Sequence, residues 1–509
     1  MGPASDRKVA EAAPGGFYPI DRTLDDIAPR EFSGDSFQRP HALLWDTVRY
    51  VESKGGLPAP TEKAPVVIIG GGMSGLMSAY LLRDLNPLVL EQAPRLGGNA
   101  RAEVWRGLEY ALGAAYFLEP EEGTPLRNVM NEIGIHYPPK ETADPVILNG
   151  KKYTSFGEGE SDPARRPAFA KYRRYLSDVF HQKRGHRYPD LPFEGEWMNS
   201  LDKLSLVEKL EKDLGPLHPH LRSAVESYCW TSFNATGDEV SAVAGLNFLA
   251  AESGKVWVPP GGNASVAEAL AKRLPVERLR TGAIVFQVTQ ASDKVVVSYE
   301  DANGKFRAVE TGAVIMACPK FVVKKILPQI EPVRVEAIDR IRYRGYLVAN
   351  VMLKKSVRPL FYDMFFLGNP GVVDTVLADF ARPEAKQSVL TLYRALPFDG
   401  ARGELYRPDS YARYRAEFEK TIVKEVLPMV GAGESDIVDI RLTRWGHPIP
   451  VADKGRVADG TVKALRAPFR DRVFFVEQDN WLLPALETAA AEAFHFAPQV
   501  QSLVKSTFL

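Results

Sequence analysis

The most constraining feature of the sequence is an apolar run that leads directly into three spaced glycines. Residues 66–69 (VVII) carry no polar side chain, which favours a strand buried on both faces of a parallel sheet. Gly70, Gly72 and Gly75 follow in the pattern Gly-x-Gly-x-x-Gly, and residues 74–85 then have apolar side chains at helical spacing. A strand, a glycine turn and a helix in this order predict the first unit of a Rossmann-like α/β domain.

The residues after this helix indicate what the turn binds. Residues 88–90 form a second short apolar strand, and Glu91 follows it with Gln92 beside it. A carboxylate at this separation from the glycines is typical of a dinucleotide site, where it accepts hydrogen bonds from the adenosine ribose. The segment therefore predicts a dinucleotide site that includes both Glu91 and Gln92.

Each glycine of the turn has a separate physical purpose. Gly70 allows the tight turn, Gly72 lets a pyrophosphate approach the backbone, and Gly75 allows the helix to pack closely on the strand. The helix N-terminus, which contains Met73 and Ser74, offers N–H groups and a partial positive charge to the phosphates. We expect all five residues to contact the cofactor.

The loop that follows identifies the dinucleotide. Arg95, Gly97 and Gly98 resemble the FAD-binding fingerprint of flavin amine oxidases, phytoene desaturases and their relatives. The resemblance implies that this loop adds backbone and arginine contacts to the FAD pyrophosphate. Family members usually carry arginine directly after the glycine pair, whereas this chain has Asn99 there and Arg101 two residues later.

Two further segments resemble the same family. Residues 113–116 (GAAY) are similar to a small-residue turn that passes against the isoalloxazine ring, which implies that Ala114 and Ala115 lie beside the flavin. A plain β-turn is the alternative interpretation. Residues 281–288 are similar to the strand that passes the adenine, and Val285 is the matching position.

The C-terminal segment completes the resemblance. Family members carry a strand, an acid that binds the ribitol, and a helix whose N-terminus points at the flavin pyrimidine. Asp479 is the matching acid, with Glu477 as the second choice, and Leu486 begins the matching helix. Such a helix stabilises negative charge on a reduced flavin through its dipole.

The subfamily is indicated by several short segments. GFYP with FSGDSFQRPHALLWD, EVSAVAGLNF, VLTLYRAL and RWGHPIP are similar to a bacterial spermidine-dehydrogenase-like branch. Monoamine oxidases often place a lysine near flavin N5, whereas this chain has Ala349 and Asn350 at the matching positions. The pair of tyrosines that forms a cage in those enzymes is also missing, because Ala485 stands in place of one of them. No Ser-Gly-Gly-Cys-Tyr sequence occurs, so the resemblance implies noncovalent FAD.

Composition excludes several other classes of protein. The 64 basic and 64 acidic residues balance to a formal net charge of +0, which gives no support to a nucleic-acid partner. Cys229 and Cys318 lie far apart, so we expect no metal site. No stretch approaches the roughly 18 apolar residues of a membrane span, and the first residues lack an apolar signal region. We expect a cytoplasmic or periplasmic protein, and its N-terminus is compatible with proteolytic processing. A homodimer is one expected oligomeric state.

The length suggests about two or three domains. The expected fold class is α/β, with a Rossmann-like FAD-binding domain and a discontinuous substrate domain made of a sheet plus helices. The predicted ranges are an N-terminal extension over 1–64, an FAD-binding domain over 65–125, 255–325 and 435–509, and a substrate domain over 126–254 and 326–434.

Four residues are candidates for the substrate cavity, namely Tyr116, Trp445, His447 and Trp481. Trp481 lies just after the predicted ribitol acid and is placed to face the flavin ring. His447 is expected to titrate near neutrality and to adjust the protonation of the substrate. For each aromatic residue a core position is the alternative, and for the histidine a structural or surface position.

Three functions remain open at this stage. The first is an FAD-dependent oxidase or dehydrogenase that takes a hydride from a small-molecule amine, with a polyamine as one candidate, and passes electrons to oxygen or another acceptor. The second is a flavin-dependent desaturase or isomerase of C–C bonds in an apolar substrate. The third is a flavin-binding scaffold without activity. An acidic funnel with aromatic walls favours the first, and an apolar tunnel without carboxylates favours the second.

Overall fold

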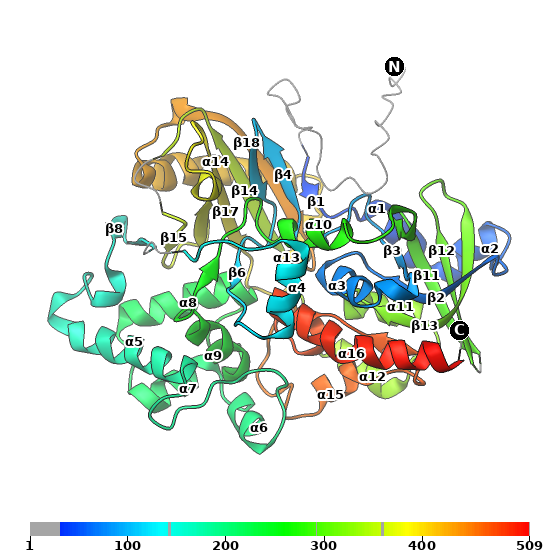
Figure 1. Ribbon diagram of the computed structural model, residues 1–509. Helices are drawn as coiled ribbons and strands as arrows, with labels where there is room; N and C mark the ends of the chain where they lie inside the picture. Colours follow the sequence, from blue (N-terminus) through cyan, green and yellow to red (C-terminus); the bar gives the residue numbers. More distant parts are fainter. Residues whose placement is uncertain (1–30, 141–143, 292, 358–360, 508–509) are drawn as a thin grey trace, which may run out of the picture.

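The computed structural model describes residues 31–140, 144–291, 293–357 and 361–507. Within these residues the chain forms two large sheets, one on each side of the molecule in Figure 1, with helices around them. This mixed α/β architecture confirms the predicted fold class. The GFYP segment lies outside the described residues.

The first sheet is built around the glycine turn and has seven strands. Six strands follow the order β10-β3-β2-β13-β12-β11. The seventh strand, β19, pairs with β13. β2, β3, β10 and β19 run parallel to their neighbours, whereas β11, β12 and the first half of β13 form an antiparallel meander. The bounds are β2 Glu62–Ile69, β3 Leu88–Leu90, β10 Leu279–Arg280, β11 Ile284–Ala291, β12 Lys294–Glu300, β13 Phe306–Met316 and β19 Val473–Phe475.

β13 joins the two parts of this sheet. β13 is one continuous strand of 11 residues. Its first half pairs with β12, and Val314 in its second half pairs with Val67 of β2 and Val473 of β19. Val314 is fully buried, as expected for a central parallel strand.

Helices cover the seven-stranded sheet. α3 (Met73–Leu81) begins at the glycine turn, as predicted, and packs against α16 (Leu486–Thr507) and α10 (Ala264–Ala271). Leu76, Ala490 and Ile315 belong to one buried apolar cluster between these helices and the sheet. Figure 1 shows α16 running beside α3 towards the C-terminus.

The second sheet has eight strands in the order β1-β18-β14-β17-β16-β15-β7-β8. Its strands come from all over the chain, including the N-terminal extension and the predicted FAD-binding range 435–509, which supplies β18. β7 and β8 form an antiparallel hairpin within the predicted substrate-domain range 126–254. The bounds are β1 Ser33–Gly34, β7 Val146–Leu148, β8 Lys151–Tyr153, β14 Tyr346–Leu353, β15 Asp363–Phe366, β16 Asp374–Leu377, β17 Ser388–Ala395 and β18 Ile437–Trp445.

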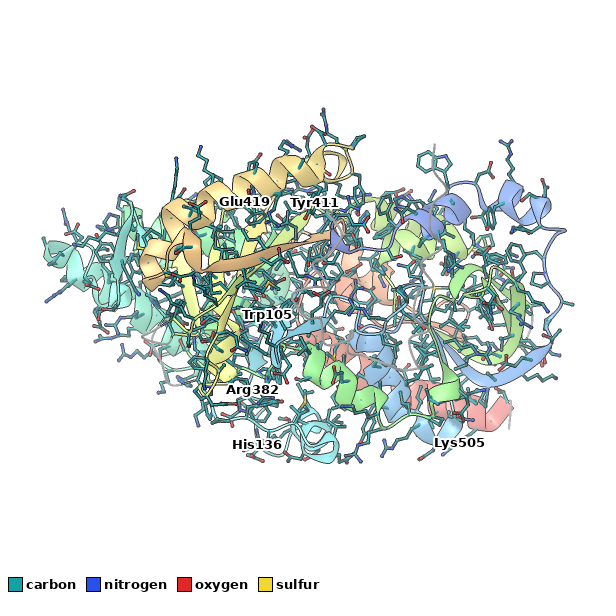
Figure 2. All side chains as sticks on the ribbon, turned by 90° about the horizontal axis from the view of Figure 1, so that it is seen from above. Trp105, His136, Arg382, Tyr411, Glu419 and Lys505 are labelled. Atoms are coloured by element: carbon teal, nitrogen blue, oxygen red, sulfur yellow. The ribbon has the colours of Figure 1, made fainter. Side chains whose placement is uncertain are left out.

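The two faces of the eight-stranded sheet have different partners. One face packs on α13 (Ala401–Leu405) and α14 (Ser410–Thr421) through an apolar cluster. Figure 2 shows Tyr411 and Glu419 of α14 along one outer edge. The other face packs on the hairpin of β4 (Ala102–Trp105) and β5 (Leu108–Ala111), and Figure 2 shows Trp105 nearer the middle. This second face therefore looks towards the glycine-turn side of the molecule.

A helical lobe lies next to the eight-stranded sheet (Figure 1). Its helices are α5 Arg166–Phe180, α6 Glu196–Asp202, α7 Leu206–Leu214, α8 Pro219–Phe233 and α9 Ala242–Ala251. The remaining elements are α1 Gln38–Leu44, α2 Thr47–Ser53, α4 Pro125–Ile133, α11 Lys320–Ile326, α12 Pro332–Asp339, α15 Thr461–Arg466, β6 Phe117–Leu118 and β9 Val256–Trp257. Within the described ranges, no helix combines the length and apolarity needed to cross a bilayer.

Gly75 lets α3 pack closely on the glycine turn. A Cβ atom added there would lie 1.9 Å from the carbonyl oxygen of Gly70. We expect Gly75→Ala to lower the free energy of unfolding by about 1–3 kcal/mol, because the backbone has to move. Gly403→Ala is the control, since its Cβ would meet nothing within 4 Å. Thermal unfolding of both variants measures the difference, and equal midpoints would contradict the prediction.

Candidate functional site

The glycine turn leaves hydrogen-bond donors open at the start of α3. Gly72 is the N-cap residue and has no side chain that could cap the helix. The first N–H groups of a helix have no partner within the helix. Gly70 lies close to Ala317, because a Cβ atom added at Gly70 would be 2.2 Å from the carbonyl oxygen of Ala317. Met73 and Ser74 stand at a helix N-terminus suited to an anion.

The second glycine pair lies directly beside the first turn. The N–H of Gly97 donates to the carbonyl of Gly71 at 2.8 Å, and Gly72 and Gly97 form a parallel bridge. A Cβ at Gly72 would lie 3.8 Å from the Cα of Gly98. The two glycine segments thus form one backbone surface, as the dinucleotide prediction requires.

Two arginines stand close together at this surface. Burial, together with the positive charge of Arg95, lowers the pKa of Arg101 to about 10. Arg101 donates to the carbonyl oxygens of Gly98 at 2.9 Å and Gly34 at 2.8 Å, and its guanidinium lies over the ring of Trp445. The nearby carboxylates of Glu91, Asp35 and Glu103 partly offset the lowering of the Arg101 pKa. The sequence prediction included Arg95 and left out Arg101, although the arginine expected by the family pattern was displaced to that position.

Glu91 connects the turn with the neighbouring strand. Its Oε2 accepts from the N–H of Gly71 and its Oε1 from the N–H of Ala93, both at 2.7 Å. The side chain is buried, and burial raises its pKa. Its backbone carbonyl accepts from Ala283, so β11 with Val285 starts beside it. The carboxylate is fixed in place with lone pairs left for ribose hydroxyls, whereas the neighbouring Gln92 is exposed.

These features fit an FAD. The open N–H groups of α3 and the arginine pair suit a pyrophosphate, and the fixed carboxylate of Glu91 suits a ribose. Asn99, the remaining predicted residue of this loop, donates instead to the carbonyl of Pro448.

The turn at 113–115 is held by the eight-stranded sheet. Four side chains donate to its backbone carbonyls or to those just before it, which is a feature that the sequence did not reveal. The bonds are Asn350 Nδ2 to Ala111 at 3.0 Å, Trp445 Nε1 to Leu112 at 2.8 Å, Tyr393 Oη to Gly113 at 2.7 Å and Tyr362 Oη to Ala115 at 3.1 Å. Ala114 keeps exposed surface in the middle of this arrangement.

The predicted ribitol acid lies in a buried charged cluster. Asp479 accepts from the backbone N–H of Lys320 at 3.2 Å and from the hydroxyl of Tyr343. Lys320 is fully buried, and its Nζ lies 2.7 Å from Oε1 of Glu477 and donates to Asn480. Sequence reasoning missed Lys320, because nothing in the local pattern reveals that the first residue of α11 meets Glu477, 157 positions later in the chain.

The start of α16 carries an unsatisfied polar atom. Leu486 is buried in the apolar cluster under α3. Two residues further on, the buried hydroxyl of Thr488 has no hydrogen-bond partner among the described residues. An orphaned hydroxyl in the first turn of this helix fits the predicted approach of a polar cofactor ring.

The prediction that His447 titrates near neutrality is wrong. Burial, with smaller effects from Arg402 and His41, lowers the pKa of His447 to about 3. Its ring stacks on Phe321 with centroids 4.0 Å apart. His447 is therefore neutral near physiological pH and does not titrate there.

Trp481 has the contacts of a core residue. Its indole N–H donates to Glu492 at 2.8 Å, Phe193 packs edge-on against its ring, and Arg466 lies over the ring. The side chain is buried in the large apolar cluster of the first sheet. These contacts favour the core alternative over a position facing the flavin.

Tyr116 lies at the edge of a group of tyrosines and carboxylates. Its ring meets Tyr362 edge-to-face with centroids 5.8 Å apart. On the neighbouring strands, Asp363 and Asp374 are buried, and each has a carboxylate oxygen, Oδ1, without a hydrogen-bond partner in the described chain. Burial raises the pKa of Asp374 to about 7 and that of Asp363 well above its usual range. Among the described residues no cluster of histidine, cysteine or carboxylate side chains is suited to a metal ion.

The fold and the glycine site define a flavoprotein of the dinucleotide-binding α/β class. The family model of flavin containing amine oxidoreductases matches residues 73–375, which is more than half of the chain. The protein belongs to this family and is an FAD-dependent oxidoreductase. The spermidine-dehydrogenase-like branch within the family stays a prediction.

The relatives agree at the level of the family. Oxidoreductase PigB of Serratia sp. strain ATCC 39006 is 26% identical over 94% of this chain and 80% of its own length. The flavin-containing amine oxidase of Oncorhynchus mykiss is 26% identical, and the match spans 54% of each chain. The chain thus spans about half the length of that amine oxidase.

Solved structures share the fold. Putrescine oxidase bound to putrescine has a TM-score of 0.69 at 16% identity, and the match covers 87% of this chain and 100% of that one. Cyclohexylamine oxidase from Brevibacterium oxydans IH-35A has a TM-score of 0.65 at 17% identity, with 87% and 99% covered. A fatty acid isomerase from P. acnes has a TM-score of 0.64 at 16% identity, with 89% and 100% covered. At these identities the likeness concerns the fold alone.

Glu91→Gln tests the placement of the FAD site. The substitution removes one of two fixed acceptor oxygens and the negative charge, so we expect FAD to bind at least about tenfold more weakly. The ratio of flavin to protein absorbance in the purified variant is the measurement, followed by titration of the apoprotein with FAD. Glu277→Gln at an exposed position is the control. Full flavin content in Glu91→Gln would contradict this placement.

The cluster around Lys320 predicts a pH dependence. Burial and the neighbouring Asp479 raise the pKa of Glu477 from 4.5 to about 8. Between these values the folded apoprotein holds a proton that the unfolded chain has released, so the free energy of unfolding falls as the pH rises. We expect Glu477→Gln to flatten this fall.

Thermal unfolding of the apoproteins across this pH range is the measurement. Glu336→Gln, at an exposed residue of α12, should keep the slope of the unmodified chain. An equally steep fall in Glu477→Gln would show that the proton is held elsewhere.

Proposed function

We propose that the protein oxidises an amine. The observation that carries the proposal is the group of tyrosines and carboxylates beside the turn at 113–115. Tyr362 and Tyr393 donate to this turn, and Asp363 follows Tyr362 in the chain. Asp374 lies opposite Tyr393 in the sheet register. Aromatic faces attract cations, and the buried carboxyl groups offer hydrogen-bond partners to an amine nitrogen.

The two aspartates supply acceptors for such a substrate. Asp363 pairs with Val376 and Asp374 with Phe365, so the two carboxylates are diagonal neighbours on one face of the β15–β16 hairpin. Thr231 donates to Oδ2 of Asp374 at 2.6 Å. The oxygens without partners can accept N–H groups from an amine, and an apolar substrate would leave them unsatisfied.

The chain's own residues position the reaction. When bound, FAD supplies the hydride acceptor. The four donors to 111–115 fix the turn against which the ring is expected to lie, and Glu91 fixes the distant ribose end. Neutral His447 adds no positive charge that would repel a cationic substrate. The printed substrates of the fold neighbours, putrescine and cyclohexylamine, agree with an amine, and a polyamine is one candidate.

A desaturase or isomerase of apolar substrates is the second candidate function. The fold likeness to a fatty acid isomerase supports it at the level of the fold. The buried carboxylates disfavour it, because an apolar chain cannot satisfy them. A scaffold without activity would give no reduction of the flavin with any substrate.

Anaerobic mixing with candidate substrates distinguishes these functions. We expect amines to bleach the flavin absorbance of the purified protein, while polyenes and fatty acids leave it unchanged. The panel consists of monoamines, diamines, polyamines, amino acids and polyenes at matched concentrations. Bleaching by polyenes alone would support the second function, and no bleaching by any compound, in a protein that dithionite reduces, would support a scaffold.

A further inference from the structure

Arg101 is a buried cation that the proposed function does not use. The residue is 9% exposed, and its guanidinium donates to the neutral carbonyl oxygens of Gly98 and Gly34. Among the described residues, no carboxylate forms an ion pair with it. A buried charge is normally paired with an opposite charge, because removing an isolated ion from water is costly. The unpaired guanidinium of Arg101 therefore indicates an anionic ligand.

The carboxylates whose charges act on Arg101 have other partners. Glu91 accepts from two backbone N–H groups, and Glu103 forms an ion pair with an arginine of β18 at 2.9 Å. Asp35 accepts from the hydroxyl of Tyr406 at 2.9 Å and from a backbone N–H group. A guanidinium has more N–H groups than two carbonyl oxygens occupy. The remaining N–H groups of Arg101 can therefore bind an anion.

Arg101 lies between the two parts of the predicted cofactor site. On one side, its Nε donates to the carbonyl of Gly98, which belongs to the glycine pair beside the turn before α3. On the other side, its guanidinium lies 4.6 Å from the ring centroid of Trp445, which donates to the carbonyl of Leu112. The pyrophosphate of FAD joins the adenosine to the flavin half, so it is the anion that suits this position.

A segment of the N-terminal extension supplies the second acceptor of Arg101. We call residues 33–35 the N-terminal strap. Nη2 of Arg101 donates to the carbonyl oxygen of Gly34 at 2.8 Å, and Gly34 is the last residue of β1. This bond connects two positions that lie 67 residues apart in the chain. The strap therefore reaches a side chain that the glycine fingerprint alone does not fix.

The strap is attached to the eight-stranded sheet along its whole length. β1 pairs in parallel with β18, and the hydroxyl oxygens of Ser33 and Thr443 lie 2.8 Å apart. The backbone N–H of Asp35 donates to the carbonyl of Arg444 at 3.0 Å. The carboxylate of Asp35 accepts from Tyr406, which fixes the end of the strap. The carbonyl of residue 34 is thus held in place from both sides.

Gly34 occupies a position that favours glycine. Its φ is +98°, a conformation that residues with a side chain rarely adopt. A Cβ atom added there would lie 2.4 Å from the carbonyl oxygen of Arg444. The close pairing of the strap with β18 therefore depends on the missing side chain, and this pairing brings the carbonyl of Gly34 within hydrogen-bond distance of Arg101.

We propose that the N-terminal strap is part of the FAD site, with Gly34 as a positioning residue for Arg101 and Arg101 as a ligand of the pyrophosphate. The carbonyls of Gly98 and Gly34 fix the guanidinium before the cofactor binds. An arginine that is already fixed loses less conformational entropy when it binds an anion, so the affinity for FAD rises. This role holds whichever substrate the flavin oxidises.

Gly34→Ala tests the role of the strap. The added Cβ collides with the carbonyl of Arg444, so residue 34 has to move away from Arg101. We expect FAD to bind roughly ten- to a hundredfold more weakly, the usual effect of losing a hydrogen bond to a charged group. Titration of the apoprotein with FAD, followed by flavin fluorescence, gives the dissociation constant.

Gly55→Ala is the matched control for this variant. Gly55 lies in the same N-terminal extension and has a φ of +94°, so an alanine there meets a comparable backbone strain. Its Cβ would meet nothing within 4 Å. The dissociation constant for FAD should therefore stay that of the unmodified chain.

A double-mutant cycle separates the positioning of Arg101 from a general loss of stability. Arg101→Gln removes the charge and should itself weaken FAD binding roughly ten- to a hundredfold. If the strap acts through Arg101, adding Gly34→Ala to Arg101→Gln should weaken binding by less than about twofold more. A loss that is as large in the Arg101→Gln protein as in the unmodified chain would overturn the role of the strap. Unchanged FAD binding in Gly34→Ala would overturn it as well.

Tyr406→Phe provides a milder test if Gly34→Ala does not fold. It removes the hydroxyl that donates to Asp35 and leaves the backbone of the strap unchanged. We expect FAD to bind roughly two- to tenfold more weakly, the effect of one lost hydrogen bond. The thermal midpoint of the apoprotein shows whether the variant is folded. A folded Tyr406→Phe protein that binds FAD as tightly as the unmodified chain would count against the strap, and amine oxidation would be unaffected.

Discussion

The arrangement of the whole molecule depends on hydrogen bonds from one sheet to the backbone of a neighbouring segment. Asn350, Tyr362, Tyr393 and Trp445 donate to carbonyls within 111–115. The donors lie on or just before strands of the eight-stranded sheet, and the segment leads back to the glycine-turn side. Buried hydrogen bonds of this kind are costly to break, because each carbonyl would be left unsatisfied. The relative position of the two sheets is therefore fixed where a flavin ring has to fit.

Buried charge is the second organising constraint. Lys320 is fully buried, and Glu477 and Asn480 supply polar partners for its ammonium group. The carboxylates of Asp363 and Asp374 are not compensated in the same way. The contrast between the two sites has a functional meaning, because a structural network satisfies its own polar groups, whereas a binding site leaves hydrogen-bonding atoms for a ligand.

The parts of the site that sequence could predict are those made by continuous segments. The glycine turn, the strand β3 and Glu91 lie within one short stretch, and local spacing fixes their geometry. The role expected for His447 failed, because its protonation depends on burial by Phe321 and Tyr343, which are distant in the sequence. Trp481 was predicted to face the flavin because it lies just after Asp479 in the chain. Its contacts with Phe193 and Glu492 instead direct its side chain towards the protein core.

The sequence by itself determined the dinucleotide turn, the class of cofactor and the α/β fold, since strand and helix periodicity and glycine spacing act over a few residues. Only the tertiary structure brought Asn350, Tyr362, Tyr393 and Trp445 to the carbonyls of residues 111–115, because they come from four separate parts of the chain. It also decided which carboxylates have partners and which do not. Satisfaction of a buried charge is a property of the whole packed chain, and no single segment carries the information.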